Sequence, residues 1–255
     1  MKMPGQLWLT LLVIVFTGWC GGVDHTVNKR DVGESPVNQA TPGMISLDFT
    51  PMTDPISTFV SIRPDNQAKM VRYSRSLLVI KGSGEGILSR QDAAALLDKA
   101  RALANDICSK NFGTPGLTRG DQFHLTINVD QKQLACVGFI EDAPPTIRSL
   151  VEDVLSISRK LPPSTLADGY LRSEPISSNR YDALRKSPTL RFVNLETFPN
   201  DTQQILVTAI NQPRAFIAIS TEQRKNLLER IANGQELFLT HKNSGHQLTL
   251  FRAQK

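Results

Sequence analysis

The sequence predicts an α+β fold in which antiparallel strand pairs carry helices packed on one face. Several short runs alternate apolar and polar residues, and amphipathic helical stretches separate these runs. A composition of 40% apolar and 21% charged residues is sufficient for a packed core. The order of these runs predicts two similar ββαββ-type blocks, a first domain at 57–161 and a smaller second domain at 189–255, joined by a linker at 162–188.

The first block begins with three strand-like runs, at 58–64, 69–74 and 76–82. A Pro-Asp-Asn sequence between the first two predicts a turn. The glycine-rich stretch 82–86 fits neither G-x-G-x-x-G nor the Gly-Lys-Ser/Thr ending of a P-loop. It is therefore interpreted as a tight strand-to-helix connection that needs positive φ angles.

The clearest helix is expected to begin at Ser89, because Asp92 three residues later makes a start like a capping box. Apolar residues then recur at spacings of three and four, at Ala93, Leu96, Ala100, Leu103 and Ile107. The helix is expected to end near Lys110. An alanine-rich face of this kind is expected to lie flat on a sheet.

Residues 121–140 predict a β-hairpin, because apolar and polar residues alternate on both sides of an Asp-Gln-Lys turn. His124 belongs to the polar side of this alternation. A second helix is expected to follow Pro144-Pro145, since proline is tolerated in a first helical turn. Pro162-Pro163 ends it.

The segment 162–188 is rich in proline and serine and has no sustained period, so it is interpreted as a linker. Three strands are expected after it, at 190–198, 203–210 and 214–220. Ser220 and Gln223 predict a second capping box at the start of a short helix. A hairpin is expected at 236–252.

The N-terminus has the layout of a signal peptide, because Lys2 precedes the uncharged run Leu7–Cys20 and small residues follow. Its fourteen residues fall short of the roughly 20 that cross a bilayer comfortably. Residues 1–22 are therefore expected to be a signal peptide or a membrane anchor. Residues 23–56 are polar and irregular, which predicts a flexible spacer.

Three outcomes follow for this segment. Cleavage would release a soluble exported protein into the periplasm, the cell envelope or the medium, and retention would leave a membrane anchor. The run also resembles a bacterial lipoprotein signal, because Cys20 ends it and Gly-Gly follows. That resemblance implies lipidation of Cys20, although Trp19 stands where such signals have Gly, Ala or Ser.

Cys108 and Cys136 remain when Cys20 is removed or lipidated. An even pair in an exported chain predicts a disulfide, and the alternative is two small buried thiols.

The sequence assigns no catalytic, cofactor-binding or metal-binding residues. No G-x-S-x-G or S-x-x-K motif is present, and His241 and His246 have no further zinc ligand nearby. The leading hypothesis is therefore a non-enzymatic, exported or membrane-tethered binding or scaffold protein of the cell envelope. Its expected partner is a protein or another envelope component, and the N-terminus is its contact with the membrane.

Two alternatives stay open. One is an envelope hydrolase whose residues meet only in three dimensions, with Ser83, Asp121 and His124 as candidates. The other is an anion or nucleic-acid binder in the C-terminal third, where residues 161–255 carry 12 Lys and Arg against 8 Asp and Glu. Its candidates are Arg185, Lys186, Arg191 and Arg214. Nucleic acid is the weaker partner, since only 6% of residues are aromatic.

Overall fold

The computed structural model describes residues 44–106, 110–113, 120–130, 132–177, 179, 182, 192–229, 237–241 and 244–254. All of them fall in one compact unit. The predictions for the signal segment, for Cys20 and for most of the spacer lie outside the described residues. Those for Cys108, Arg185, Lys186 and Arg191 also lie outside them.

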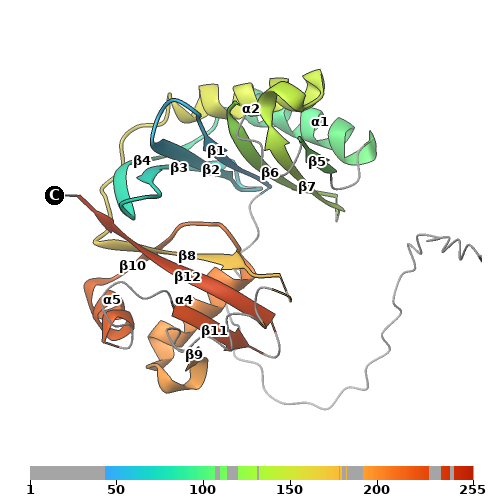
Figure 1. Cartoon of the computed structure of the whole chain (residues 1–255). Helices are drawn as coiled ribbons and strands as arrows, with labels where there is room; N and C mark the ends of the chain where they lie inside the picture. Colours follow the sequence, from blue (N-terminus) through green and yellow to red (C-terminus); the bar gives the residue numbers. More distant parts are fainter. Residues whose placement is uncertain are drawn as a thin grey trace, which may run out of the picture. The chain divides into compact units, whose positions relative to one another are not determined.

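The first half of this unit is a sheet with two helices on one face. Its strands are β1 (Ile45–Thr50), β2 (Ile56–Ile62), β3 (Gln67–Ser74), β4 (Val79–Ile87), β5 (Lys110–Phe112), β6 (Gln122–Val129) and β7 (Lys132–Phe139). They lie in the order β4-β3-β2-β1-β6-β7-β5, antiparallel except for the pair β5 and β7. Helices α1 (Arg90–Asp106) and α2 (Pro145–Ser158) cover the same face (Figure 1). The short helix η1 (Ile140–Asp142) precedes α2.

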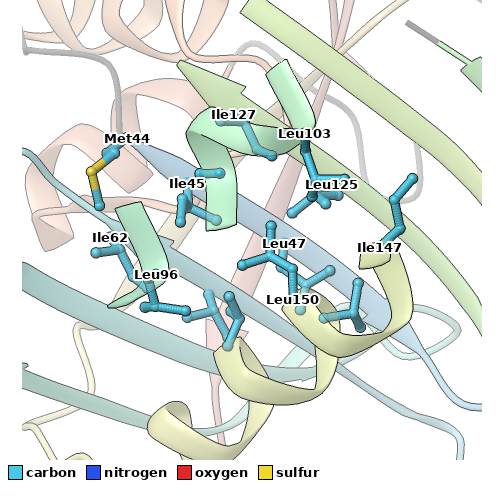
Figure 2. Packing of buried hydrophobic residues seen from close by; sticks show 14 of the residues in the cluster. Met44, Ile45, Leu47, Ile62, Leu96, Leu103, Leu125, Ile127, Ile147 and Leu150 are labelled. Atoms are coloured by element: carbon cyan, nitrogen blue, oxygen red, sulfur yellow. The ribbon is translucent and has the colours of Figure 1, made fainter. Parts of the chain in front are cut away.

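The core of this half forms around β1 and β6, in which every second residue is apolar. Figure 2 shows the resulting cluster, in which strand residues Ile45, Leu47, Ile62, Leu125 and Ile127 pack against helix residues Leu96, Leu103, Ile147 and Leu150. Burial of each such side chain contributes roughly 1.5–3 kcal/mol. The alternation leaves the opposite face of β1, β2, β3 and β6 with many polar residues, including Asp48 and His124.

Both predicted capped helix starts are confirmed. The Ser89 hydroxyl accepts a hydrogen bond from the Asp92 backbone N–H at 3.1 Å. Ser220 and Gln223 form a reciprocal capping box at the start of α5 (Thr221–Leu228), with distances of 3.2 and 2.9 Å. Local sequence thus predicts these helices because the groups that satisfy their first N–H donors lie within four residues.

The glycine-rich stretch is not a connection, so that prediction is wrong. Gly82, Gly84 and Gly86 lie inside β4, which pairs with β3. Gly84 and Gly86 allow close packing: a Cβ on Gly84 would lie 3.1 Å from the Pro162 carbonyl oxygen, and one on Gly86 would lie 3.2 Å from Pro162 Cδ. The strand carries glycines because the chain after α2 crosses directly over it.

The second half contains a further set of strands and helices. Its strands are β8 (Gly169–Pro175), β9 (Phe192–Asn194), β10 (Ile217–Ile219), β11 (Leu237–His241) and β12 (Ser244–Ala253). The short helix η2 (Leu195–Thr197) and α4 (Asn200–Asn211) precede β10, and α5 follows it. Strand β8 lies between β10 and β12, and a second core forms where Leu171 and Leu248 meet Leu206 and Ala209 of α4.

The strand predicted at 203–210 is wrong, because these residues belong to α4. Its buried residues are Thr202, Leu206 and Ala209, at spacings of four and three, which place them on one helical face. A short apolar run such as Ile-Leu-Val fits a strand equally well in sequence. The core against β8 decides between the two.

The two halves are joined by strand pairing and by an aromatic cluster. Strand β12 runs parallel to β4, with Arg252 opposite Val79, so all twelve described strands form one sheet. The ring of Phe216 lies 4.7 Å from Tyr73, 5.5 Å from Phe59 and 5.0 Å from Phe251. The α+β class is confirmed, whereas the repeat of two ββαββ blocks is not, since the two halves order their elements differently.

Two segments predicted to be irregular contain core strands. Strand β1 lies inside the predicted spacer, and β8 lies inside the predicted linker. The spacer prediction is therefore wrong from Ile45 onward. The linker prediction is wrong for β8, where burial on both faces brings Arg172 and Ser173 into the interior and hides the alternation.

Candidate functional site

A cluster of charged and polar side chains lies on the helix-free face of the first half, where β8 and the chain before β10 meet it. Its members are Asp48, Tyr73, Arg75, His124, Arg172, Glu174 and Arg214, and we call it the Arg172 cluster. Asp48 of β1 lies opposite His124 of β6 in the antiparallel register. Leu47 and Leu125 on the same strands point into the core, so strand alternation places Asp48 and His124 on this other face.

Arg172 is the centre of the cluster and is almost fully buried, with 3% of its side chain exposed. One of its guanidinium nitrogens forms an ion pair with Asp48. Its Nη1 donates to Tyr73 Oη at 3.0 Å, and the Tyr73 hydroxyl donates to Asp48 Oδ1 at 2.6 Å. The guanidinium also lies over the rings of Tyr73 and Phe216, at 5.4 and 5.1 Å. These contacts join β1, β3 and β8.

Burial and charge fix the protonation of these groups. Burial, together with the Asp48 carboxylate, raises the pKa of Tyr73 above its usual value, so the hydroxyl keeps its proton. Burial opposes the charged form of Arg172, but Asp48, Tyr73 and Glu174 together outweigh it and raise the pKa of Arg172. Tyr73 and Arg172 are thus held as phenol and guanidinium, which suits them for structural pairing with Asp48.

The outer part of the cluster carries Glu174, Arg75 and Arg214. Glu174 accepts a hydrogen bond from Arg172 at 3.2 Å and lies 3.6 Å from an Arg75 nitrogen. Arg214 has a positive φ of 70° and its backbone N–H donates to the Ser173 carbonyl oxygen at 2.7 Å. Within the described residues its side chain makes no hydrogen bond or ion pair. Burial lowers the pKa of Arg214, although Glu174 opposes this.

His124 is the histidine of the cluster, and it lies on β6 opposite Asp48. Its Nε2 lies 3.3 Å from the Thr126 hydroxyl, and its Nδ1 is buried with no hydrogen-bond partner in the described part of the chain. Burial, followed by the charge of Arg214, lowers the pKa of His124 to about 4. The imidazole is therefore neutral at physiological pH.

The three hydrolase candidates do not come together. Ser83 lies on β4 and its hydroxyl is 2.7 Å from that of Ser164. Strands β3, β2 and β1 separate it from His124 on β6. The Asp121 carboxylate accepts the Met52 backbone N–H at 2.8 Å and so holds the chain between β1 and β2. The prediction that these residues form one site is wrong, because sequence proximity does not determine which strands are neighbours.

Sequence reasoning missed the centre of the cluster, because Asp48 and Arg172 lie in the predicted spacer and linker. A signal was available at β1, where Ile45, Leu47 and Phe49 alternate with polar residues. Of the basic candidates in the C-terminal third, Arg214 is the one that the structure describes, and it belongs to this cluster.

The predicted disulfide stays a prediction, because Cys108 lies outside the described residues. Cys136 is buried on the helix-covered side of β7. Lys110 lies opposite Cys136 in the β5–β7 pair. Thiol labelling of the denatured, natively expressed protein should find both cysteines blocked until a reductant is added. Labelling of both without reductant would contradict the disulfide.

The lowered pKa of His124 predicts that the stability of the fold changes with pH. The pKa of His124 is about 4 in the folded protein against 6.5 normally, so the unfolded chain binds a proton first as the pH falls. Its contribution should be complete above pH 6.5 and should fall by about 2–3 kcal/mol towards pH 4. Urea unfolding of His124→Gln should show a flatter pH dependence than the wild type in this range. Parallel curves for the two proteins would contradict the assignment.

His246 and His241 do not form a facing pair. In the β11–β12 register His246 lies opposite Leu239, and His241 lies opposite Ser244. Burial lowers the pKa of His246. No group of three or more His, Cys, Asp and Glu side chains in the described part of the chain is arranged to hold a metal ion.

Comparisons with protein-family models, with curated proteins and with solved structures found no match for this chain. Of the helices in the described residues, none is both long enough and apolar enough to cross a membrane. The Arg172 cluster and the N-terminal sequence are therefore the features of this chain that bear on its function.

Proposed function

We propose that this chain is an exported or membrane-tethered, non-enzymatic binding or scaffold protein of the cell envelope. The observation that carries the proposal is that both acidic groups of the Arg172 cluster are already paired within the protein. Asp48 is bound by Tyr73 and Arg172, and Glu174 is bound by Arg172 and Arg75. Acidic groups engaged in this way support recognition by a fixed surface rather than proton transfer. The N-terminal signal-like segment supports the location.

The hydrolase alternative has one observation in its favour, the contact between His124 and the Thr126 hydroxyl beside Asp48. A general base works best with a pKa near the working pH, whereas the pKa of His124 is about 4. A catalytic histidine also needs a group that orients its second nitrogen. In the described residues Nδ1 of His124 has no such partner. Binding is therefore the better-supported function.

The proposed binding surface is the helix-free face around His124. Val137 of β7 lies opposite His124 and is 38% exposed, while Leu134 and Cys136 on the same strand are buried in the core. An exposed aliphatic residue beside a polar cluster is a suitable point of contact for a partner. The face is therefore the place to look for one.

Photo-cross-linking in the native host tests this function. A photoreactive amino acid is placed at Val137, and a matched control carries it at Glu152, an exposed position of α2. We expect an adduct with an envelope component from position 137 but not from 152. Mass spectrometry of the same protein should show a processed N-terminus or an acylated Cys20. Full-length, unprocessed protein in the soluble cytoplasm, or equal labelling from both positions, would contradict the proposal.

A further inference from the structure

We propose that the turn between β3 and β4 contacts the surface of an anionic membrane. The side chains of Leu77 and Leu78 enter the apolar boundary of the bilayer, and two basic groups beside them bind a lipid phosphate. This is a second contact with the membrane, besides the N-terminal segment. It rests on the envelope location proposed above, because that location brings lipid within reach of the folded unit.

The apolar part of this surface is the pair Leu77 and Leu78. Their residues are 64% and 41% exposed, and they are neighbours in the turn between the two strands. A single exposed leucine is common on a protein surface, whereas adjacent ones are typical of a surface that a partner covers. The turn therefore offers aliphatic contact area outside the core.

The backbone holds these leucines in place. Leu78 has a φ of 51°, in the left-handed region that a leucine rarely adopts. Its carbonyl oxygen accepts a hydrogen bond from the backbone N–H of Arg252 at 3.1 Å, which fixes the turn against β12. Positions with backbone strain of this kind concentrate at functional sites. The turn thus presents its apolar side chains on a rigid frame.

The basic part of the surface is a hollow next to the turn, where the end of β12 lies beside β4 (Figure 1). It has a volume of about 370 Å³ and is lined by Leu77, Val79, Lys81, Arg252, Ala253 and Gln254. This size is at the lower end of the range for sites that take small groups, about 300–1,000 Å³. The lining residues include two cations and no carboxylate.

The two cations of the hollow are not neutralised by the part of the chain that the structure describes. Lys81 Nζ donates to the side-chain oxygen of Gln254, which is an uncharged amide. Within the described residues neither Lys81 nor Arg252 forms an ion pair. Two exposed positive charges beside an apolar wall favour an anion that is attached to an aliphatic body.

The opposite end of β4 shows that exposure alone does not create such a surface. Ile87, the last residue of the strand, is 79% exposed. However, Glu85, two residues before it, pairs with Lys69 of β3 at 3.4 Å, so these neighbouring charges compensate each other. The turn differs because its exposed aliphatic residues lie beside uncompensated cations.

An anionic bilayer fits this arrangement better than a protein or a soluble anion. Its phosphate layer lies directly above hydrocarbon, so a surface that contacts both needs cations next to exposed aliphatic side chains. A stable protein interface buries more than about 1,000 Å², which two leucines and one small hollow do not supply. A soluble anion would engage the cations but would leave the leucines in water.

Tryptophan fluorescence of the full-length chain on phospholipid vesicles tests the contact, with a brominated lipid as the quencher. The native tryptophans, Trp8 and Trp19, both lie in the N-terminal segment and are replaced by phenylalanine. Leu77→Trp then places a single tryptophan at the turn, and Ile87→Trp is the matched control at the other end of β4. The vesicles are either pure phosphatidylcholine or a mixture with phosphatidylglycerol.

We expect strong quenching of Leu77→Trp on the anionic vesicles, weak quenching on pure phosphatidylcholine, and weak quenching of Ile87→Trp on both. Adding Lys81→Gln with Arg252→Gln should weaken docking of the turn about tenfold or more, because each basic group near an anionic surface contributes about fivefold. Adding Arg63→Gln with Arg159→Gln instead, which removes two exposed charges elsewhere, should leave docking unchanged. Salt at 1 M should also weaken docking, because the screening length falls to about 3 Å.

Equal quenching at positions 77 and 87, equal quenching on both kinds of vesicle, or equal effects of the two double substitutions would overturn the inference. So would a spectral change of Leu77→Trp on adding inorganic phosphate without vesicles, which would indicate a soluble anion. If the N-terminal segment holds the chain on the vesicles while Leu77→Trp stays unquenched, the inference fails and the envelope location does not. The cross-linking experiment at Val137 then decides the proposed function separately.

Discussion

The substitution Arg172→Met is expected to lower the free energy of unfolding by about 3–5 kcal/mol. It removes the buried partner of Asp48, whose residue is only 8% exposed, and the hydrogen-bond donor of the fully buried Tyr73 hydroxyl. The carboxylate would then remain in the interior with one neutral donor. The midpoint temperature of thermal unfolding should fall by roughly 6–20 °C, at about 2–4 °C per kcal/mol for a chain of this size.

Two further variants separate charge pairing from packing. Arg252→Met, which changes an exposed arginine of β12, should alter the midpoint little. The triple variant Asp48→Leu, Tyr73→Phe and Arg172→Met should be more stable than Arg172→Met alone, because it leaves no unpaired buried group. If Arg172→Met behaved like Arg252→Met, the cluster would not hold the two halves together. Measurements by circular dichroism and by urea unfolding decide this.

The sequence predicted those elements whose determinants are local. The capped starts of α1 and α5 depend on residues three positions apart, and the β6–β7 hairpin depends on strict alternation around one turn. In both cases neighbouring residues determine the conformation, and the structure confirms the predictions. The segment 203–210 failed because its apolar run fits a strand and a helix equally well, and only the core against β8 selects α4.

The centre of the candidate site lay beyond prediction for a different reason. Asp48 and Arg172 are 124 residues apart, and their contact depends on β8 reaching the helix-free face of β1. Neither residue belongs to a motif. Because β8 contains a buried arginine, its sequence does not alternate apolar and polar residues and was interpreted as part of a polar linker. Pairing of this kind follows from the tertiary arrangement of the strands. The hydrophobic periodicity of a sequence, two residues for a strand and 3.6 for a helix, does not encode that arrangement. His124 was identified, but its partners were not.

Strand β1 provides the second large expected effect, because it tests whether the segment predicted as a spacer is part of the core. Leu47→Ala is expected to cost about 2–5 kcal/mol of unfolding free energy. Leu47 is fully buried in the core cluster (Figure 2), and β1 lies between β2 and β6 in the sheet. The neighbouring backbone is paired on both sides, so it should relax little into the space that the smaller side chain leaves.

Ser46→Ala is the matched control, since Ser46 precedes Leu47 and lies on the other face of the same strand. Its effect should stay within about 0.5 kcal/mol. A large loss for Leu47→Ala with little change for Ser46→Ala requires that β1 is inserted in this register, because a shift of one residue would exchange the two faces. The same register places Asp48 beside His124. Equal effects of the two substitutions would therefore contradict both the placement of β1 in the core and the candidate site that depends on it.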